Sequence, residues 1–193
     1  MTPSHDTVCK NTRNWLEHAV IGLNLCPFAK SVYVKGQVHY AVSDARYADE
    51  LLADLVTELK ALAASNAATR DTTLLMAPYC MDDFLDFNDF LGQADRALVR
   101  LGLDGVLQIA SLHPYYQFAG TEADDVTNFT NRSPYPTLHL LREESIDRAV
   151  AAFPNAESIY EVNMATMDRL GVAGWTELEV GASASTPKPE DRR

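Results

Sequence analysis

Apolar residues recur at helical spacing in several separate stretches of the chain. The clearest stripe covers residues 84–101 and follows Asp82 and Asp83, either of which can cap a helix amino terminus. A similar stripe predicts a first helix that Asp6 or Thr7 caps. Further helices are expected over residues 43–62, 145–153 and 157–170.

Short apolar runs between these helices predict strands at residues 73–77, 106–111 and 137–141. Residues 32–42, which turn at Lys35-Gly36-Gln37, are expected to form one bent strand or a small hairpin. Strands that alternate with helices indicate an α/β fold of the α+β sandwich kind, with helices packed on a mixed sheet of about four strands. A ferredoxin-like or related arrangement is the first choice, and a short doubly wound sheet is the alternative. One globular domain over residues 6–180 is expected, with a disordered tail over residues 181–193.

The composition excludes several classes of function. The net charge is −11, and an acidic surface repels phosphate backbones, so a nucleic-acid partner is not expected. The sequence contains neither a Walker-type loop nor GxGxxG, so no standard nucleotide phosphate loop is predicted. Three widely spaced cysteines without CxxC do not suggest a disulfide scaffold, and no run of apolar residues suggests a signal peptide or membrane span. We therefore expect a soluble, cytoplasmic protein.

The stretch from Leu112 to Glu143 is too long and too rich in functional side chains for an ordinary connection. It holds two of the five histidines and three of the nine prolines, together with three tyrosines and two arginines. Connections usually take about 4–6 residues, and much longer ones are generally functional or disordered. Its aromatic residues argue against disorder. The candidate site is therefore placed in this stretch.

Two histidines and a carboxylate are the candidate acid–base or metal-binding groups. His113 follows the end of a predicted buried strand, which is where ligands bind in open α/β sheets. Asp125 is the carboxylate expected to orient it, and His139 lies within the next strand. His113, Asp125 and His139 have the composition of a two-histidine, one-carboxylate site for a divalent metal, although their spacing matches no known signature. The alternative is that His113 bonds a loop carbonyl and that His139 is a core residue.

The run from Asn131 to Pro136 is expected to be stiff, because residues before prolines are held extended. Stiffness suits the presentation of Asn131 and Arg132 to a substrate, and the arginine fork matches a carboxylate or a phosphate. Tyr116 and His139 are assigned to the same substrate-binding role. The alternative for Arg132 is that it pairs with Asp124 or Asp125 and staples the loop shut.

Cys26 is the candidate nucleophile or third metal ligand. Pro27 is expected to end the first helix and to begin a new helical turn, so that Cys26 becomes the N-cap of that turn near Lys30. A helix amino terminus and a nearby lysine favour the thiolate. The alternative is that Cys26 is a small buried apolar group.

Four motifs resemble those of an uncharacterised bacterial family, domain-of-unknown-function family 1415. The resemblance extends from about the first helix to Gly171 and implies no established activity. The motifs are Gly22-Leu23-Asn24-Leu25-Cys26-Pro27-Phe28-Ala29, Asn88-Asp89-Phe90, Gln108-Ile109-Ala110-Ser111 and His113-Pro114 through Glu143.

Two functions are predicted from these residues. The first is an enzyme, hydrolase- or transferase-like, that acts on a small anionic metabolite through His113, Asp125, Arg132 and, in one version, Cys26 or a metal. The second is a non-catalytic module that binds a small molecule or a protein through the same rigid aromatic and proline loop. An exposed aromatic patch would favour the module, whereas rings buried around His113 would favour the enzyme. A third alternative is that the loop only packs over the sheet.

Overall fold

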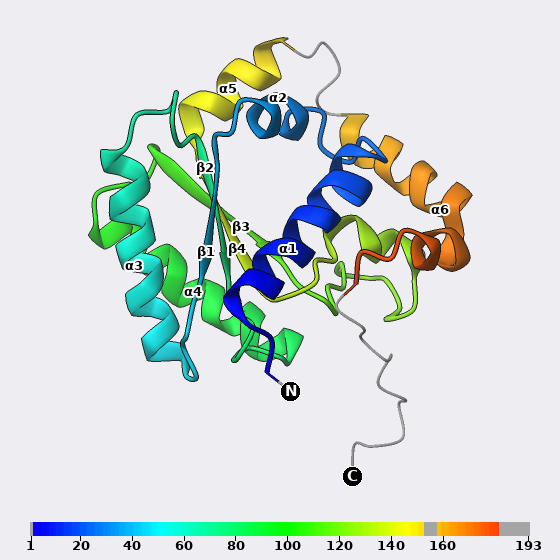
Figure 1. Cartoon of the computed structure of the whole chain (residues 1–193), viewed down its shortest axis with the longest axis horizontal. Helices are drawn as coiled ribbons and strands as arrows, with labels where there is room; N and C mark the ends of the chain where they lie inside the picture. Colours follow the sequence, from blue (N-terminus) through cyan, green and yellow to red (C-terminus); the bar gives the residue numbers. More distant parts are fainter. Residues whose placement is uncertain (1, 153–157, 182–193) are drawn as a thin grey trace.

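A four-stranded mixed sheet lies at the centre of the molecule (Figure 1). The computed structural model describes residues 2–152 and 158–181. The strand order is β1-β2-β4-β3, with β1 parallel to β2 and with β4 antiparallel to both of its neighbours. The strands are β1 (Val38–Val42), β2 (Thr72–Met76), β3 (Leu107–Leu112) and β4 (Thr137–Arg142).

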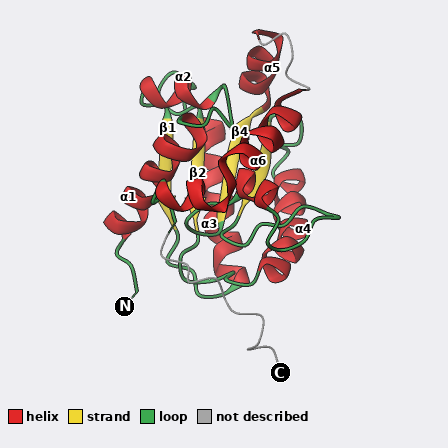
Figure 2. Cartoon of the chain, turned by 90° about the vertical axis from the view of Figure 1, so that its right-hand side faces the viewer, coloured by secondary structure: helices red, strands yellow, loops and turns green. Residues whose placement is uncertain are grey.

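Helices cover both faces of this sheet. On one face, α3 (Ala48–Ala64) and α4 (Phe84–Arg100) bury a core that includes Leu55, Leu75, Phe87 and Leu138, here called the α3–α4 core. On the other face, α1 (His5–Trp15), the π-helix η1 (Leu16–Ile21) and the end of α6 (Ile159–Glu177) bury a second core with β1 and β2, here called the α1 core. The α6 helix lies over the strands in the view of Figure 2.

The order of elements in the sheet is β-α-β-α-β-β. The predicted mixed four-stranded sheet with packed helices is confirmed, and its element order differs from the ferredoxin-like order β-α-β-β-α-β. β1 and β2 are joined through α3, and β2 and β3 through α4, so these three strands run in the same direction. β4 then inserts between β2 and β3. Two antiparallel neighbours need no helical crossover, which leaves residues 113–136 free to form a long loop.

The edge where β1, β2 and β3 end and β4 begins, here called the carboxyl edge, collects the loops of interest. The start of α1 is fastened to this edge, because His5 Nε2 lies 2.8 Å from Asp44 Oδ1 and the Tyr79 hydroxyl donates to the Pro3 carbonyl at 2.8 Å. Three connecting segments leave or enter strands at the carboxyl edge: residues 43–47, 77–83 and 113–136. The opposite edge, where β1 begins, is approached by α2 (Ala29–Val34), as Figure 1 shows.

Several local predictions need correction. Residues 32–34 are helical in α2 and not a strand. The cap of α1 is Ser4, whose hydroxyl accepts from the Thr7 amide, and not Asp6 or Thr7. The first helical segment changes to a π-helix at Leu16 and ends at Gly22, five residues before Pro27.

Towards the carboxyl terminus the helices are longer than predicted. The helix α5 (Glu143–Ala152) begins directly after β4, and α6 continues past Gly171, where it kinks at φ 66°. Phe153 and the predicted tail beyond Gly181 lie outside the described residues. The predicted cap Asp83 is confirmed, since its carboxylate accepts from the amides of Leu85 and Asp86.

Candidate functional site

The long loop is organised from within by Asn128. Its side chain is fully buried, and Oδ1 accepts from the Phe118 amide and from the Thr121 hydroxyl at 2.9 and 2.8 Å. Its Nδ2 donates to the Glu122 carbonyl at 2.8 Å. These three bonds tie two turns of the loop to the 3-10 helix η2 (Val126–Asn131), so the loop is an ordered structure.

Both ring nitrogens of His113 are engaged by main-chain groups. Nδ1 accepts from the Tyr115 amide at 3.0 Å, so the proton of the neutral ring lies on Nε2, which donates to the Met81 carbonyl at 2.9 Å. The ring is fully buried and packs on Phe84 and Phe87 of α4, with centroids 5.4 and 5.2 Å away. Burial lowers the pKa of His113. In this geometry neither nitrogen can reach a substrate or a metal unless a hydrogen bond breaks.

Asp125 caps η2 and does not contact His113. Its Oδ1 accepts from the amide and the hydroxyl of Thr127 at 2.9 and 2.7 Å. These hydrogen bonds lower the pKa of Asp125 because they stabilise the carboxylate. The predicted role of orienting the histidine therefore has no contact to support it here.

Arg132 holds the loop together through carbonyl groups. Its Nε donates to Tyr116 O at 3.3 Å, and one terminal nitrogen donates to Ala123 O at 2.7 Å. The guanidinium lies over the Phe129 ring, 4.2 Å from its centroid. Within the described ranges no carboxylate pairs with Arg132, in contrast to the expected pairing with Asp124 or Asp125. Burial lowers its pKa, because the charged form loses hydration.

Asn131 and Tyr116 contribute to the same loop through their main chains. The Asn131 carbonyl accepts from the His113 amide at 3.2 Å, and the Tyr116 amide donates to the His113 carbonyl at 3.1 Å. The Tyr116 ring packs against Phe84 and Phe118, with centroids 5.2 and 5.0 Å away. The predicted substrate-binding roles of both residues stay predictions.

The aromatic residues form neither a fully exposed patch nor a shell around His113. Tyr135 is 8% exposed, whereas Tyr115, Tyr116 and Phe129 are half-buried. The Tyr115 ring lies 5.9 Å from the His113 ring, but Phe129 turns away from it and packs on Trp175 of α6. The rings are therefore divided between two sides of the loop.

His139 lies in the middle of β4, on the opposite face of the sheet from the His113 ring. It pairs in register with Leu74, a member of the α1 core, whereas His113 packs on Phe87 of the α3–α4 core. The Nε2 atom lies 2.7 Å from the Thr72 hydroxyl oxygen. Burial lowers the pKa of His139 to about 4. The two histidines therefore do not converge.

Cys26 lies far from the carboxyl edge. Its carbonyl accepts from the amide of Ala29, the first residue of α2, and α2 leads into the start of β1. His113 instead follows the end of β3, which runs parallel to β1. The N-cap of α2 is Phe28, so Cys26 does not cap that helix, and its half-buried side chain packs against the α1 core. Across residues 2–152 and 158–181, no three histidine, cysteine or carboxylate side chains are grouped to hold a metal.

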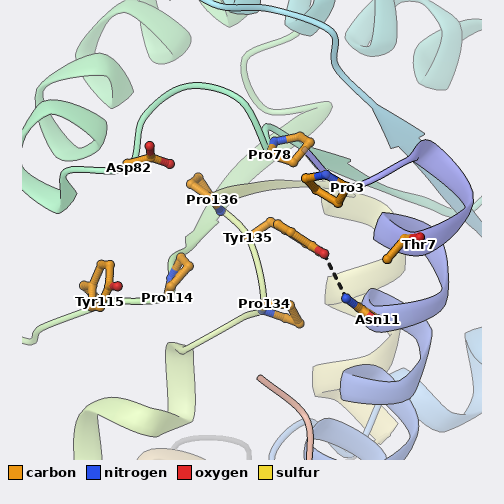
Figure 3. Close-up of a pocket in the computed structure, with 10 residues that line it drawn as sticks. All are labelled: Pro3, Thr7, Asn11, Pro78, Asp82, Pro114, Tyr115, Pro134, Tyr135 and Pro136. Carbon is orange, nitrogen blue, oxygen red and sulfur yellow. Dashed lines mark hydrogen bonds between the residues drawn. The ribbon is translucent and has the colours of Figure 1, made fainter. Parts of the chain in front are cut away.

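A pocket nevertheless opens at the carboxyl edge, beside these residues (Figure 3). Its volume is about 560 Å³, within the roughly 300–1,000 Å³ of small-molecule sites. Four chain segments meet here: the start of α1, the turn after β2, the turn after β3 and the entry to β4. The lining residues include five prolines and are Pro3, Thr7, Asn11, Pro78, Asp82, Pro114, Tyr115, Pro134, Tyr135 and Pro136.

The polar groups of the pocket lie at two separated places. Asp82 lies on one side, and Asn11 and Tyr135 lie on the other, with prolines between them (Figure 3). The Asn11 Nδ2 donates to the Tyr135 hydroxyl at 2.8 Å. Asp82 is exposed, and no side chain or amide in the described part of the chain bonds or pairs with its carboxylate. Burial raises the pKa of Tyr135, so this hydroxyl keeps its proton at neutral pH.

Sequence reasoning located half of this pocket. The stretch from Leu112 to Glu143, which the composition identified, contributes five of the lining residues: Pro114, Tyr115, Pro134, Tyr135 and Pro136. It missed Thr7 and Asn11, since both lie on a helix with an ordinary amphipathic pattern. The sequence did contain a signal that Asp82 is available for a function. The helix α4 needs only one N-cap residue, and two adjacent aspartates precede it. Asp83 takes the cap, which leaves Asp82 available to the pocket.

The chain is a mixed α/β protein with a pocket of small-molecule size at the carboxyl edge of its sheet. The chain belongs to the family described as Protein of unknown function (DUF1415), which matches residues 7–177. Comparisons with curated proteins and with solved structures found no match. Among the described residues, no helix combines the length and the apolar character that crossing a membrane requires.

Proposed function

We propose that this protein binds a small organic molecule in the pocket at the carboxyl edge, as a binding module without a catalytic step. The observation that supports this most strongly is the lining itself. Five prolines from separate parts of the chain form the walls of one pocket, and the polar groups between them include the carboxylate of Asp82, which has no partner among the residues that the structure describes. Such a pocket is largely preformed, and preorganisation reduces the entropy lost on binding.

The size of the pocket favours a small molecule over a macromolecule. Specific protein interfaces bury roughly 800 Å² on each partner, whereas a pocket of about 560 Å³ suits one compact molecule. The half-buried Tyr115 and the largely buried Tyr135 give it aromatic walls without creating a broad exposed patch. Apolar walls with a few placed polar groups are the usual composition of ligand sites.

Catalysis on an anionic metabolite by His113, Asp125 and Arg132 stays a prediction with less support. Each of these side chains already bonds a loop group, and none of them lines the pocket. The ten lining residues include one carboxylate and no lysine or arginine. An anionic ligand would therefore meet the repulsive charge of Asp82 and no guanidinium group that could donate hydrogen bonds to it.

Blocking the pocket tests this proposal. Thr7 lies exposed in the first turn of α1 and lines the pocket, so Thr7→Phe should fill it, whereas Lys10→Phe adds the same ring to an exposed position of α1 outside the lining. A fragment library of cationic, neutral and anionic ring compounds is screened by saturation-transfer NMR against both variants and the parent. We expect fragments that bind the parent and Lys10→Phe but lose their signal with Thr7→Phe. Fragments whose binding is unchanged in Thr7→Phe would contradict the proposal.

A further inference from the structure

We propose that the pocket selects a compact organic cation that carries an ammonium group at one end and an oxygen-containing group, such as a hydroxyl, at the other. This inference rests on the proposed function and adds to it the chemical class of the ligand. It follows from the placement of the charged and hydrogen-bonding groups along the pocket, seen in Figure 3.

The cation is assigned to Asp82. Its carboxylate is exposed in the pocket lining, and no hydrogen bond or ion pair within the described residues uses it. The helix α4 does not need it, because Asp83 accepts from the Leu85 and Asp86 amides. No basic side chain shares the lining, and the net charge of −11 adds an attractive field for cations.

The oxygen function is assigned to Asn11 and Tyr135 at the other end. With Nδ2 of Asn11 donating to the Tyr135 hydroxyl, the phenolic proton and the amide oxygen stay available. If the amide were turned over, the phenol would donate and an amide N–H together with the phenolic oxygen would stay available. Either way the pair presents at least one donor and one acceptor, which is what a hydroxyl group requires.

The walls between these ends set the shape of the ligand. Pro78, Pro114, Pro134 and Pro136 offer apolar ring surfaces, and Tyr115 adds an aromatic ring. An aromatic ring near a carboxylate also favours a cation, since the ring face attracts positive charge. The first turn of α1, which contains Thr7, carries the positive end of the helix dipole and therefore favours the oxygen end of the ligand.

A set of four probes separates the charge from the hydroxyl group. Tyramine carries both, phenethylamine lacks the hydroxyl, tyrosol replaces the ammonium by a neutral hydroxyl, and 3-(4-hydroxyphenyl)propionate carries the opposite charge. Each is titrated at pH 7 into ¹⁵N-labelled protein at low salt, and the shifts of the amides of residues 7, 11, 82, 115 and 135 give Kd. The titrations are repeated with Asp82→Asn and, as a matched control at the opposite edge of the sheet, with Asp104→Asn.

We expect tyramine to bind most tightly and the propionate most weakly. Asp82→Asn should weaken tyramine about fivefold, the upper range for an exposed ion pair, and leave tyrosol unchanged. Asp104→Asn should change neither. The inference is overturned, and the proposed pocket stands, if the propionate binds as tightly as tyramine or if Asp82→Asn leaves the tyramine Kd unchanged. If none of the four probes moves these amides, the inference and the proposed function are both overturned.

Discussion

His139 makes the stability of this protein sensitive to acid. Thr72 donates its hydroxyl proton to the Leu140 carbonyl at 2.7 Å, so the bond at 2.7 Å between Thr72 and His139 has Nε2–H as its donor. The Nε2–H group of the neutral ring is satisfied in this way, and burial lowers the pKa of His139 to about 4, below the unfolded value of 6.5. The unfolded chain therefore binds a proton first as the pH falls.

Replacing His139 by Gln should remove part of this acid sensitivity. Above about pH 6.5 the lowered pKa has no effect, and between pH 6.5 and 4 it lowers the free energy of unfolding progressively. We expect the parent to lose about 2 kcal/mol more than His139→Gln between pH 6.5 and 4.5. Urea unfolding at four pH values measures this difference, with the exposed His18→Gln as the control. Equal losses in the parent and His139→Gln would contradict the assignment.

At the residue level the sequence could indicate where polar side chains gather but not which groups they bond. His113, Asp125 and Arg132 were selected because their chemistry suits a substrate. All three instead bond groups of their own protein: Met81 O and Tyr115 N, Thr127, and the carbonyls of Tyr116 and Ala123. A loop of this length has many buried main-chain groups to satisfy, and they compete for the same side chains. The hydrogen-bond partners of these side chains depend on the path of the folded loop, and residue spacing in the sequence does not determine that path.

Among the elements, the π-helix η1 depends on a single glycine. The Gly22 amide donates to the Glu17 carbonyl at 2.9 Å, and Leu25 to Val20 at 2.9 Å, both with the five-residue step of a π-helix. A Cβ added at Gly22 would lie 2.2 Å from the His18 carbonyl oxygen, which is a backbone clash. The chain can therefore follow this path out of the first helical segment only if residue 22 has no side chain.

The pair Gly22→Ala and Gly92→Ala tests this requirement. At Gly92, inside α4, the nearest atom to an added Cβ is the end of the Arg96 side chain at 3.5 Å, so alanine fits. We expect Gly22→Ala to cost about 2 kcal/mol or more and Gly92→Ala to stabilise by about 0.5–1 kcal/mol, because alanine is the better helix former. Thermal or urea unfolding measures both. If Gly22→Ala left the free energy of unfolding unchanged, the turn could accommodate a side chain, and the π-helix would not depend on glycine at this position.

The sheet elements were predictable, whereas the connection from α1 to β1 was not. Three strands have short, largely apolar runs, of which β2 is buried along its whole length, so pattern alone located them to within a residue or so. Val32-Tyr33-Val34 has the composition of a strand but forms α2, closed by the Gln37 amide donating to Val32 O at 3.1 Å. Tertiary packing of Tyr33 against the α1 core overrides the local preference of such a short run.

At the scale of the whole molecule, the two tryptophans fasten the long loop to opposite ends of the chain. Trp15 of α1 is 3% exposed and donates Nε1–H to the Arg132 carbonyl at 2.8 Å. Trp175 of α6 packs on Phe129, with ring centroids 5.2 Å apart. Both helices belong to or pack against the α1 core. The loop that borders the pocket is therefore built into the same core that holds the two ends of the described chain.

This arrangement predicts that the loop unfolds together with the rest of the protein. In Trp175→Phe the fluorescence reports Trp15 alone, and in Trp15→Phe it reports Trp175 alone. For each variant we expect the urea midpoint from fluorescence to coincide with the midpoint from far-UV circular dichroism, as in a two-state transition. If the loop of residues 113–136 unfolded independently, it would instead lose its tryptophan contact at lower urea. Coincident midpoints would mean that the loop bordering the pocket belongs to the cooperatively folded structure, as a preorganised binding site requires.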